Sequence, residues 1–312
     1  MTTGNLIANV SARGTIPFHS TMQKLTLSFA VTSHAICTAA LFAATPTASP
    51  PTDEAGKALR AFFDAEWDYA MEQNPTRASS LGDRRWNDRW DDDSLEANQK
   101  QQEHAKAALL QLTKMDPAIL SPADRLNYEL FKKRLEQEIA GFRFRMHLLP
   151  INQRGGIQTA DELSDSLRFT TVKDYEDWLA RLRSFPASME QQMTLMREGV
   201  KAHIIWPKVV LERVPAQIDK QIVDNPEESP FFKPFKRFPK DLAAADQERL
   251  SQAARDAISS GIVPAFHKLK EYFVAEYLPA AFPEVGVWQM PDGGELYTYL
   301  AQRYTTTNLT PQ

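Results

Sequence analysis

The segment SPADRLNYELFKKRLEQEIAGF, residues 121–142, decides the fold class of this chain. Ser121 is a typical helix cap, Pro122 suits the first helical turn, and Asp124 places a carboxylate where it can answer the cap. Behind this start, apolar side chains recur every three or four residues and form one stripe: Tyr128, Phe131, Leu135, Ile139 and Phe142. Such a stripe predicts an amphipathic helix with a buried apolar face.

The same helical spacing recurs on both sides of this segment. From about residue 54, an apolar stripe predicts a helix that Asn74-Pro75 ends. Residues 76–95 mix charges of both signs with two Trp residues, which indicates a structured loop. Within that loop, Asp91-Asp92-Asp93 either attracts a cation or caps a helix and faces solvent.

Later signals extend the helical pattern to the end of the chain. Thr171 to Asp174 predicts a second capped start, and Pro186 predicts the opening of a third helix. Ile262 to Phe273 predicts a long late helix that Pro264 kinks. Only Val285–Met290 has strand-like character, and it is short. The sequence therefore predicts an all-α fold, mostly helical, with at most a short β-hairpin.

Composition limits the classes of partner. The 312 residues are 43% hydrophobic, which is enough for a sizeable core, and Gly is scarce at 12 residues. Formal net charge is -4 and the sequence pI is about 5.9. Because binding to a phosphate backbone needs a concentrated positive charge, we expect no nucleic-acid partner.

The beginning of the chain is typical of an exported protein. Lys24 precedes the apolar stretch Leu25 to Ala44, which ends at small residues and predicts a signal peptide at 22–44. The alternative is a transmembrane anchor, but several polar residues weaken a permanent span. We expect residues 1–21 to be a mis-called start and 45–53 a linker. The expected location is the periplasm, with no stable membrane span after cleavage and no cysteine beyond Cys37.

No motif for catalysis or metal binding is recognisable. The six His residues show no pair at the ligand spacing of a helical zinc site, and there is no nucleophile elbow or Walker loop. Two loops are less ordinary. In the first, Asn152 and Gln153 precede a Gly pair, which is either a tight turn or a place where a ligand approaches the backbone. In the second, Tyr297 and Arg303 follow an Asp-Gly-Gly turn and either pack or bind a peptide carboxylate or carbonyl.

These features also resemble a known family in their order along residues 54–312. The motifs are Asn74-Pro75-x-x-Ala78, Leu81-Gly82-Asp83, Trp86 to Asp93, Asn152-Gln153 with Gly155-Gly156, and Pro291-Asp292-Gly293-Gly294 through Arg303-Tyr304-Thr305-Thr306-Thr307-x-Leu309-Thr310-Pro311. Together they resemble the DUF885 family, exported or lipid-anchored bacterial proteins of largely helical build.

The resemblance implies a longer parent protein. The family is similar to helical zinc metallopeptidases and has a His-Glu metal motif in its C-terminal half, so zinc and peptide hydrolysis are implied for the full-length parent. This chain ends at Thr310-Pro311-Gln312, the start of a helix, so we expect residues 54–312 to be a truncated N-terminal half. Its implied partners are a peptide substrate or the missing C-terminal half, and Asn152, Gln153, Tyr297 and Arg303 are the candidate substrate-binding residues. The alternatives are a non-catalytic helical binding module and the product of a degraded gene.

Overall fold

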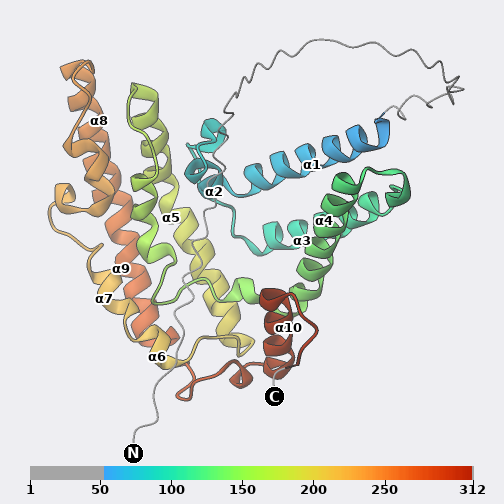
Figure 1. Ribbon diagram of the computed structural model, residues 1–312. Helices are drawn as coiled ribbons and strands as arrows, with labels where there is room; N and C mark the ends of the chain where they lie inside the picture. The colour runs from blue at the N-terminus through green and yellow to red at the C-terminus, as the bar shows by residue number, and fades with distance from the viewer. Residues whose placement is uncertain (1–52, 311–312) are drawn as a thin grey trace, which may run out of the picture. The chain divides into compact units, whose positions relative to one another are not determined.

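The computed structural model describes residues 53–310, and the all-α prediction is confirmed in that range. The only strand-like pairings there are two isolated bridges, Asn152 with Gly155 and Pro207 with Phe282. In chain order the α-helices are α1 (Glu54–Gln73), α2 (Pro75–Ser80), α3 (Leu95–Leu112), α4 (Pro122–Gly141), α5 (Val172–Lys201), α6 (Lys208–Leu211), α7 (Val214–Asp219), α8 (Ala244–Ala257), α9 (Val263–Tyr272) and α10 (Gly293–Thr305) (Figure 1). The predicted early start at 1–21, the signal peptide at 22–44 and nearly all of the linker at 45–53 lie outside the described residues.

Helices α1, α3 and α4 form one packed group, and their bounds follow the sequence signals. The Ser121 hydroxyl accepts a hydrogen bond from the Asp124 backbone N–H at 3.1 Å, as the cap prediction requires. α1 ends at Gln73, directly before Asn74-Pro75. Their apolar stripes meet in a shared core of buried side chains: Leu59, Phe62, Ala105, Ala108, Leu112, Leu120, Tyr128 and Leu135.

Helices α5 and α7 to α9 surround the largest core. Phe185 of α5 is fully buried and meets Phe231 edge-on, with ring centroids 5.1 Å apart, while Phe266 of α9 lies 5.4 Å from Phe185. Edge-to-face aromatic pairs of this kind add to the free energy that burial alone supplies. The late helix is also longer than α9 alone, because π-helical turns at Ile258–Ile262 and Phe273–Tyr277 flank it.

Two local predictions were wrong. Pro186 opens no helix, because α5 starts at a capping box on Thr171 and continues through Pro186 to Lys201. Val285–Met290 forms no strand, because Gly286 has a φ of +124° and is followed by a short 3-10 turn at Val287–Gln289. Pro264, which was predicted to kink the late helix, lies in the first turn of α9, directly after a π-helical turn, and the kink itself stays a prediction.

Residues 76–95 are ordered, as predicted, but they are not all loop, because they include most of α2 and a 3-10 turn at Arg84–Trp86. Arg181 of α5 holds α2 and the segment after it in place. The Arg181 side chain is fully buried, and its guanidinium lies 5.4 Å from the Trp90 ring centroid. It donates hydrogen bonds to four acceptors, which are the backbone oxygens of Pro75, Trp86 and Arg89 and the hydroxyl of Ser79. Burial lowers the pKa of Arg181 to about 10, so the side chain remains charged at neutral pH.

A third, smaller core positions α10. Leu296 of α10 is 2% exposed and packs with Phe144, Leu148 and Leu195, which come from the segment after α4 and from α5. Helix α10 is thereby fixed beside the end of α4, although more than 150 residues separate the two in sequence (Figure 1).

Candidate functional site

The loop that carries Asn152 is a self-contained turn. The backbone N–H of Asn152 donates to the Gly155 oxygen at 3.0 Å, and the return bond from Gly155 measures 3.2 Å. The Asn152 side-chain oxygen accepts from the backbone N–H of Arg154 at 2.8 Å. Gly156 has a φ of +144°, and a Cβ there would lie 2.9 Å from the Pro150 oxygen, so the position requires glycine. The Gly pair thus serves a tight turn, one of the two predicted alternatives.

A chain of glutamine amides ties this turn to α7. The Gln158 side chain donates to the Asn152 backbone oxygen at 2.8 Å and to the Gln217 side chain at 3.2 Å. Gln217 in turn donates to the Gln153 backbone oxygen at 3.0 Å. The backbone of the turn is therefore firmly positioned, and substrate binding by Asn152 and Gln153 stays a prediction.

The second predicted loop leads into α10, which is in direct contact with α4. Tyr299 of α10 donates its phenolic hydrogen to the Gln137 backbone oxygen of α4 at 2.8 Å. The same hydroxyl accepts a hydrogen bond from the Arg303 guanidinium at 3.1 Å. Gly141 at the end of α4 permits this approach, because a Cβ at that position would collide with the Tyr299 hydroxyl. The tyrosine therefore fixes the distance between the two helices.

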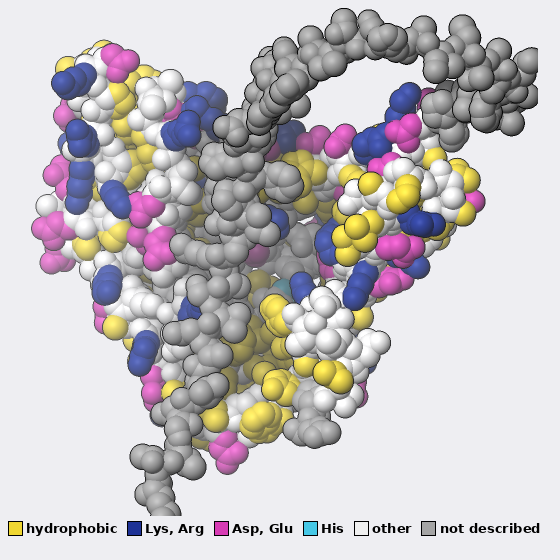
Figure 2. Space-filling view, in the orientation of Figure 1, with side chains coloured by type: hydrophobic (Ala, Val, Ile, Leu, Met, Phe, Trp, Pro, Cys, Tyr) yellow, Lys and Arg dark blue, Asp and Glu magenta, His cyan; other side chains and the backbone are white. Residues whose placement is uncertain are grey.

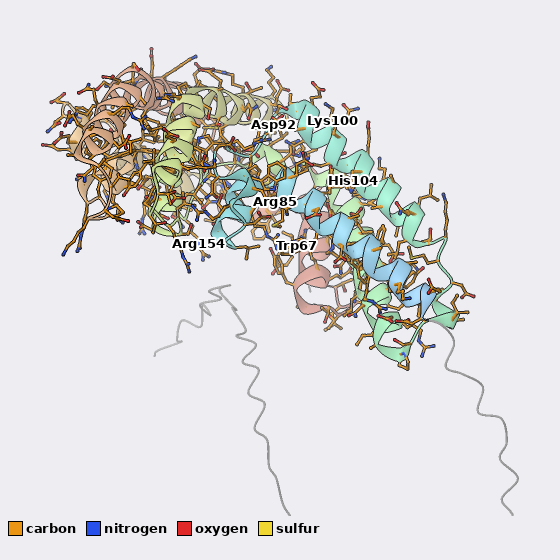
Figure 3. The ribbon with its side chains drawn as sticks, turned by 90° about the horizontal axis from the view of Figure 1, so that it is seen from above. Trp67, Arg85, Asp92, Lys100, His104 and Arg154 are labelled. Carbon is orange, nitrogen blue, oxygen red and sulfur yellow. The ribbon has the colours of Figure 1, made fainter. Side chains whose placement is uncertain are left out.

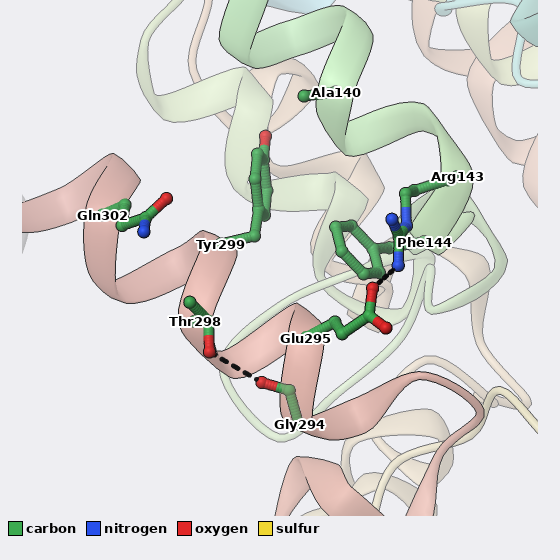
Figure 4. Close-up of a pocket in the computed structure, with 8 residues that line it drawn as sticks. All are labelled: Ala140, Arg143, Phe144, Gly294, Glu295, Thr298, Tyr299 and Gln302. Carbon is green, nitrogen blue, oxygen red and sulfur yellow. Dashed lines mark hydrogen bonds and ion pairs between the residues drawn. The ribbon is translucent and has the colours of Figure 1, made fainter. Parts of the chain in front are cut away.

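Two adjoining pockets lie on either side of Tyr299, and we call them together the α4/α10 groove. The larger has a volume of about 530 Å³ and is lined by Ala140, Arg143, Phe144, Gly294, Glu295, Thr298, Tyr299 and Gln302 (Figure 4). The smaller has a volume of about 280 Å³ and is lined by Lys133, Glu136, Gln137, Ala140, Tyr299, Gln302 and Arg303. The volume of the larger pocket is within the range of typical ligand pockets.

The groove combines aromatic surface with charged and amide groups. Arg143 and Glu295 form an ion pair that joins the end of α4 to α10 (Figure 4). The Arg143 guanidinium also lies 4.8 Å from the Phe144 ring centroid, and the Phe144 and Tyr299 centroids are 5.2 Å apart. Aromatic faces can hold an apolar side chain, whereas the Gln302 amide can donate and accept hydrogen bonds. The groove can therefore bind a ligand of mixed polarity, but it presents no evident nucleophile beside a base.

The four predicted binding residues divide between different places. Arg303 lines the smaller pocket. Tyr297 is 50% exposed and lies two positions from Tyr299, so it points from another side of α10. Asn152 and Gln153 line neither pocket of the groove. The residues that sequence reasoning missed are Arg143, Phe144, Glu295, Thr298, Tyr299 and Gln302. The four of these residues that lie on α10 were detectable in the sequence, because they are polar or aromatic and recur every three or four positions: Glu295, Thr298, Tyr299 and Gln302.

A second polar cluster lies where the segment before α3 meets α5, close to Asp92 (Figure 3). The Gln192 amide donates to the Asp93 carboxylate at 2.6 Å, and Gln191 donates to Asp92 at 2.9 Å. Burial raises the pKa of the Asp93 carboxyl to about 6, and the charges of Asp91 and Asp92 add to the increase. Among the described residues, however, no three His, Cys, Asp or Glu side chains converge as metal ligands.

The surface offers few further clues to function. On the face drawn in Figure 2, positive and negative side chains are interspersed among the described residues, without a broad area of one sign. Between residues 53 and 310, no helix combines the length and the apolar character needed to cross a membrane.

Comparison with known proteins places the chain in a family. The fold is similar to the crystal structure of the "putative lipoprotein" from Colwellia psychrerythraea, with a TM-score of 0.73, and the match covers 82% of this chain. The identity is 16%, so the likeness concerns the fold, and this chain spans 47% of the Colwellia chain. None of the curated proteins matches it. The family model described as "Bacterial protein of unknown function (DUF885)" matches residues 75–312, so this chain belongs to the DUF885 family.

Proposed function

We propose that this chain is the N-terminal, non-catalytic portion of an exported protein that hydrolyses peptides, and that its α4/α10 groove binds peptide. The groove carries the proposal, because it is a formed concave site whose lining suits a peptide and includes no obvious reacting group. The relation to the Colwellia structure supports it, since this chain spans about half of that protein's length. The description of that protein as a lipoprotein supports export.

The chemistry of the groove matches what an extended peptide presents. A peptide alternates side chains with backbone amides, so its binding site needs apolar surface and hydrogen-bonding groups within a few ångströms of each other. Phe144 and Tyr299 supply the apolar surface, and Gln302 supplies an amide that can pair with a backbone group. The Arg143–Glu295 ion pair keeps the Phe144 end of the groove polar at its rim.

Zinc has no role in this proposal for the chain itself. A catalytic zinc site in proteins takes three side-chain ligands that converge on one point. The residues between 53 and 310 do not fit that requirement, because no such set is found among them. Peptide hydrolysis is therefore proposed for the longer parent protein, and the role of this chain is to bind.

The proposal can be tested by filling the groove. Ala140 is exposed on α4 and lines both pockets, so Ala140→Trp would occupy the space without removing a buried contact. Ala61→Trp, at an exposed position of α1, is the matched control. Binding of fluorescein-labelled tetrapeptides, measured by anisotropy, should weaken at least about tenfold in Ala140→Trp only. Equal affinity in the two variants would refute groove binding, and zinc-dependent cleavage of the peptides by this chain alone would refute the non-catalytic role.

A second candidate function is docking of a partner, such as the remaining half of a Colwellia-type fold. Five large apolar side chains near the end of the described chain are each at least half exposed: Val285, Trp288, Tyr297, Tyr304 and Leu309. An exposed apolar surface often marks an interface. The double variant Trp288→Ser with Tyr304→Ser should then bind less of an apolar dye than the natural chain. Unchanged dye fluorescence would remove the support for this candidate.

A further inference from the structure

We infer that the smaller pocket of the α4/α10 groove recognises a peptide carboxylate, so that the preferred ligand is a peptide with a free C terminus and an apolar residue before it. This inference rests on the proposed function, because it specifies the peptide that the groove binds. It follows from the difference in charge between the two pockets, from the way Arg303 is held, and from the place where the pockets join.

The two pockets differ in how their positive charges are balanced. In the larger pocket, Arg143 is neutralised by Glu295 across the groove. In the smaller pocket, Lys133 and Arg303 have no acidic partner within ion-pair distance among the described residues. Glu136 also lines that pocket, but it pairs with Lys132 on its own helix at 3.6 Å. The smaller pocket therefore has positive charge available for an anionic ligand.

Arg303 is positioned before any ligand arrives. Its Nη1 donates to the Tyr299 hydroxyl at 3.1 Å, and Tyr299 is itself anchored on the Gln137 backbone oxygen at 2.8 Å. A guanidinium has five N–H donors, and no other hydrogen bond of Arg303 is found among the described residues. The remaining donors can form the bidentate pair that carboxylates make with arginine. Because Arg303 is already oriented, binding would cost less side-chain entropy than it would with a free arginine.

The connection between the pockets sets the direction of the ligand. Ala140, Tyr299 and Gln302 line both pockets, so a chain that starts at Arg303 continues directly over the Tyr299 ring toward Phe144. A carboxylate at Arg303 would therefore place the preceding side chains on the aromatic surface. An amidated peptide would meet the same aromatic surface but would lose the charge-assisted pair.

The experiment compares three peptides with the same N-terminal label on the whole chain at low salt. They are Ala-Ala-Phe-Ala with a free carboxylate, the same peptide amidated, and amidated Ala-Ala-Phe-Asp, whose only peptide carboxylate is on its last side chain. We expect the free acid to bind about five- to tenfold more tightly than the amide, as one exposed charge-assisted contact allows. The preference should shrink in 0.5 M NaCl, because salt screens exposed charges. If the aspartyl peptide alone gains affinity, the terminal carboxylate is not what the pocket selects, and the inference fails.

Variants separate this inference from the proposed function. Arg303→Gln should bind the free acid and the amide equally, and Arg303→Lys should retain part of the preference. Arg237→Gln, at an exposed arginine outside the groove, is the matched control and should keep the preference. Equal binding of acid and amide by the natural chain would overturn the inference and leave peptide binding intact. Binding of neither peptide would overturn both. Circular dichroism verifies that each variant is folded.

Discussion

Replacement of Asp93 by Asn should stabilise the protein at neutral pH and have little effect in acid. Asp93 lies between the segment before α3 and α5, where it is partly buried and accepts a hydrogen bond from Gln192 at 2.6 Å. Burial and the charges of Asp91 and Asp92 raise its pKa from 3.8 to about 6. The folded state therefore binds a proton on Asp93 more tightly than the unfolded state does.

The sign and size of the effect follow from linkage. Between pH 3.8 and about 6, the unfolded carboxyl is ionised while the folded one retains its proton, so the free energy of unfolding falls as pH rises. Above pH 6, the difference between the two pKa values corresponds to a loss of about 3 kcal/mol in the free energy of unfolding. Because Asp93 is partly solvated and Gln192 stabilises its charge, we expect Asp93→Asn to gain about 1 to 2 kcal/mol at pH 8.

Urea unfolding followed by tryptophan fluorescence at pH 4, 5, 6, 7 and 8 measures this directly. The stability gain of Asp93→Asn should appear between pH 4 and 6 and then remain constant. Asp64→Asn, which removes a charge at an exposed position of α1, is the control and should show no such pH dependence. A gain that is equal at pH 4 and pH 8, or a loss at pH 8, would refute the reasoning.

Three further predictions concern stability. Arg181→Lys removes most of the hydrogen bonds to four acceptors while leaving a charge buried. Chemical denaturation should therefore show that the free energy of unfolding falls by about 3 kcal/mol. Gly156→Ala forces a Cβ toward a backbone oxygen at positive φ, and the melting temperature should fall by an amount equivalent to about 2 kcal/mol; an unchanged melting temperature would contradict the strain argument. Tyr299→Phe removes the hydroxyl that donates to the Gln137 oxygen and accepts from Arg303. Urea unfolding should therefore show that the free energy of unfolding falls by about 1 kcal/mol. The same variant should also reduce the discrimination between acid and amide peptides.

Helix positions were predictable where local chemistry alone determines them. The cap at Ser121 and the stripe behind it involve only residues at the start of one helix and within it, and the stop at Asn74-Pro75 involves only the two residues directly after α1. The ordered character of residues 76–95 was also predictable from its Trp and charge content. The identity of its main partner was not, because Arg181 lies about 100 residues later in the chain.

Pro186 shows why a proline signal can mislead. A proline usually starts a helix or breaks one, since it lacks an N–H and its ring crowds the preceding turn. In α5 the ring is instead accommodated by a tertiary contact. Gly261, in the π-helical turn before α9, lies so close that a Cβ there would be 3.3 Å from the Pro186 ring. The burial of Phe185 and Met189 on either side of the proline then stabilises α5. This packing cannot be deduced from the residues next to Pro186 in the sequence.

The candidate site depends on the same kind of distant contact. On the sequence, Tyr297 and Arg303 were the noticeable residues of α10, whereas the structure gives the central place to Tyr299. What distinguishes Tyr299 is its partner, the Gln137 oxygen, and the glycine at 141 that admits its ring. A glycine at the end of a helix ordinarily indicates a C-cap. That Gly141 also leaves room for a side chain of α10 cannot be predicted without knowledge of the fold. The groove therefore exists because two ordinary local signals, a helix end and an amphipathic helix, meet across more than 150 residues.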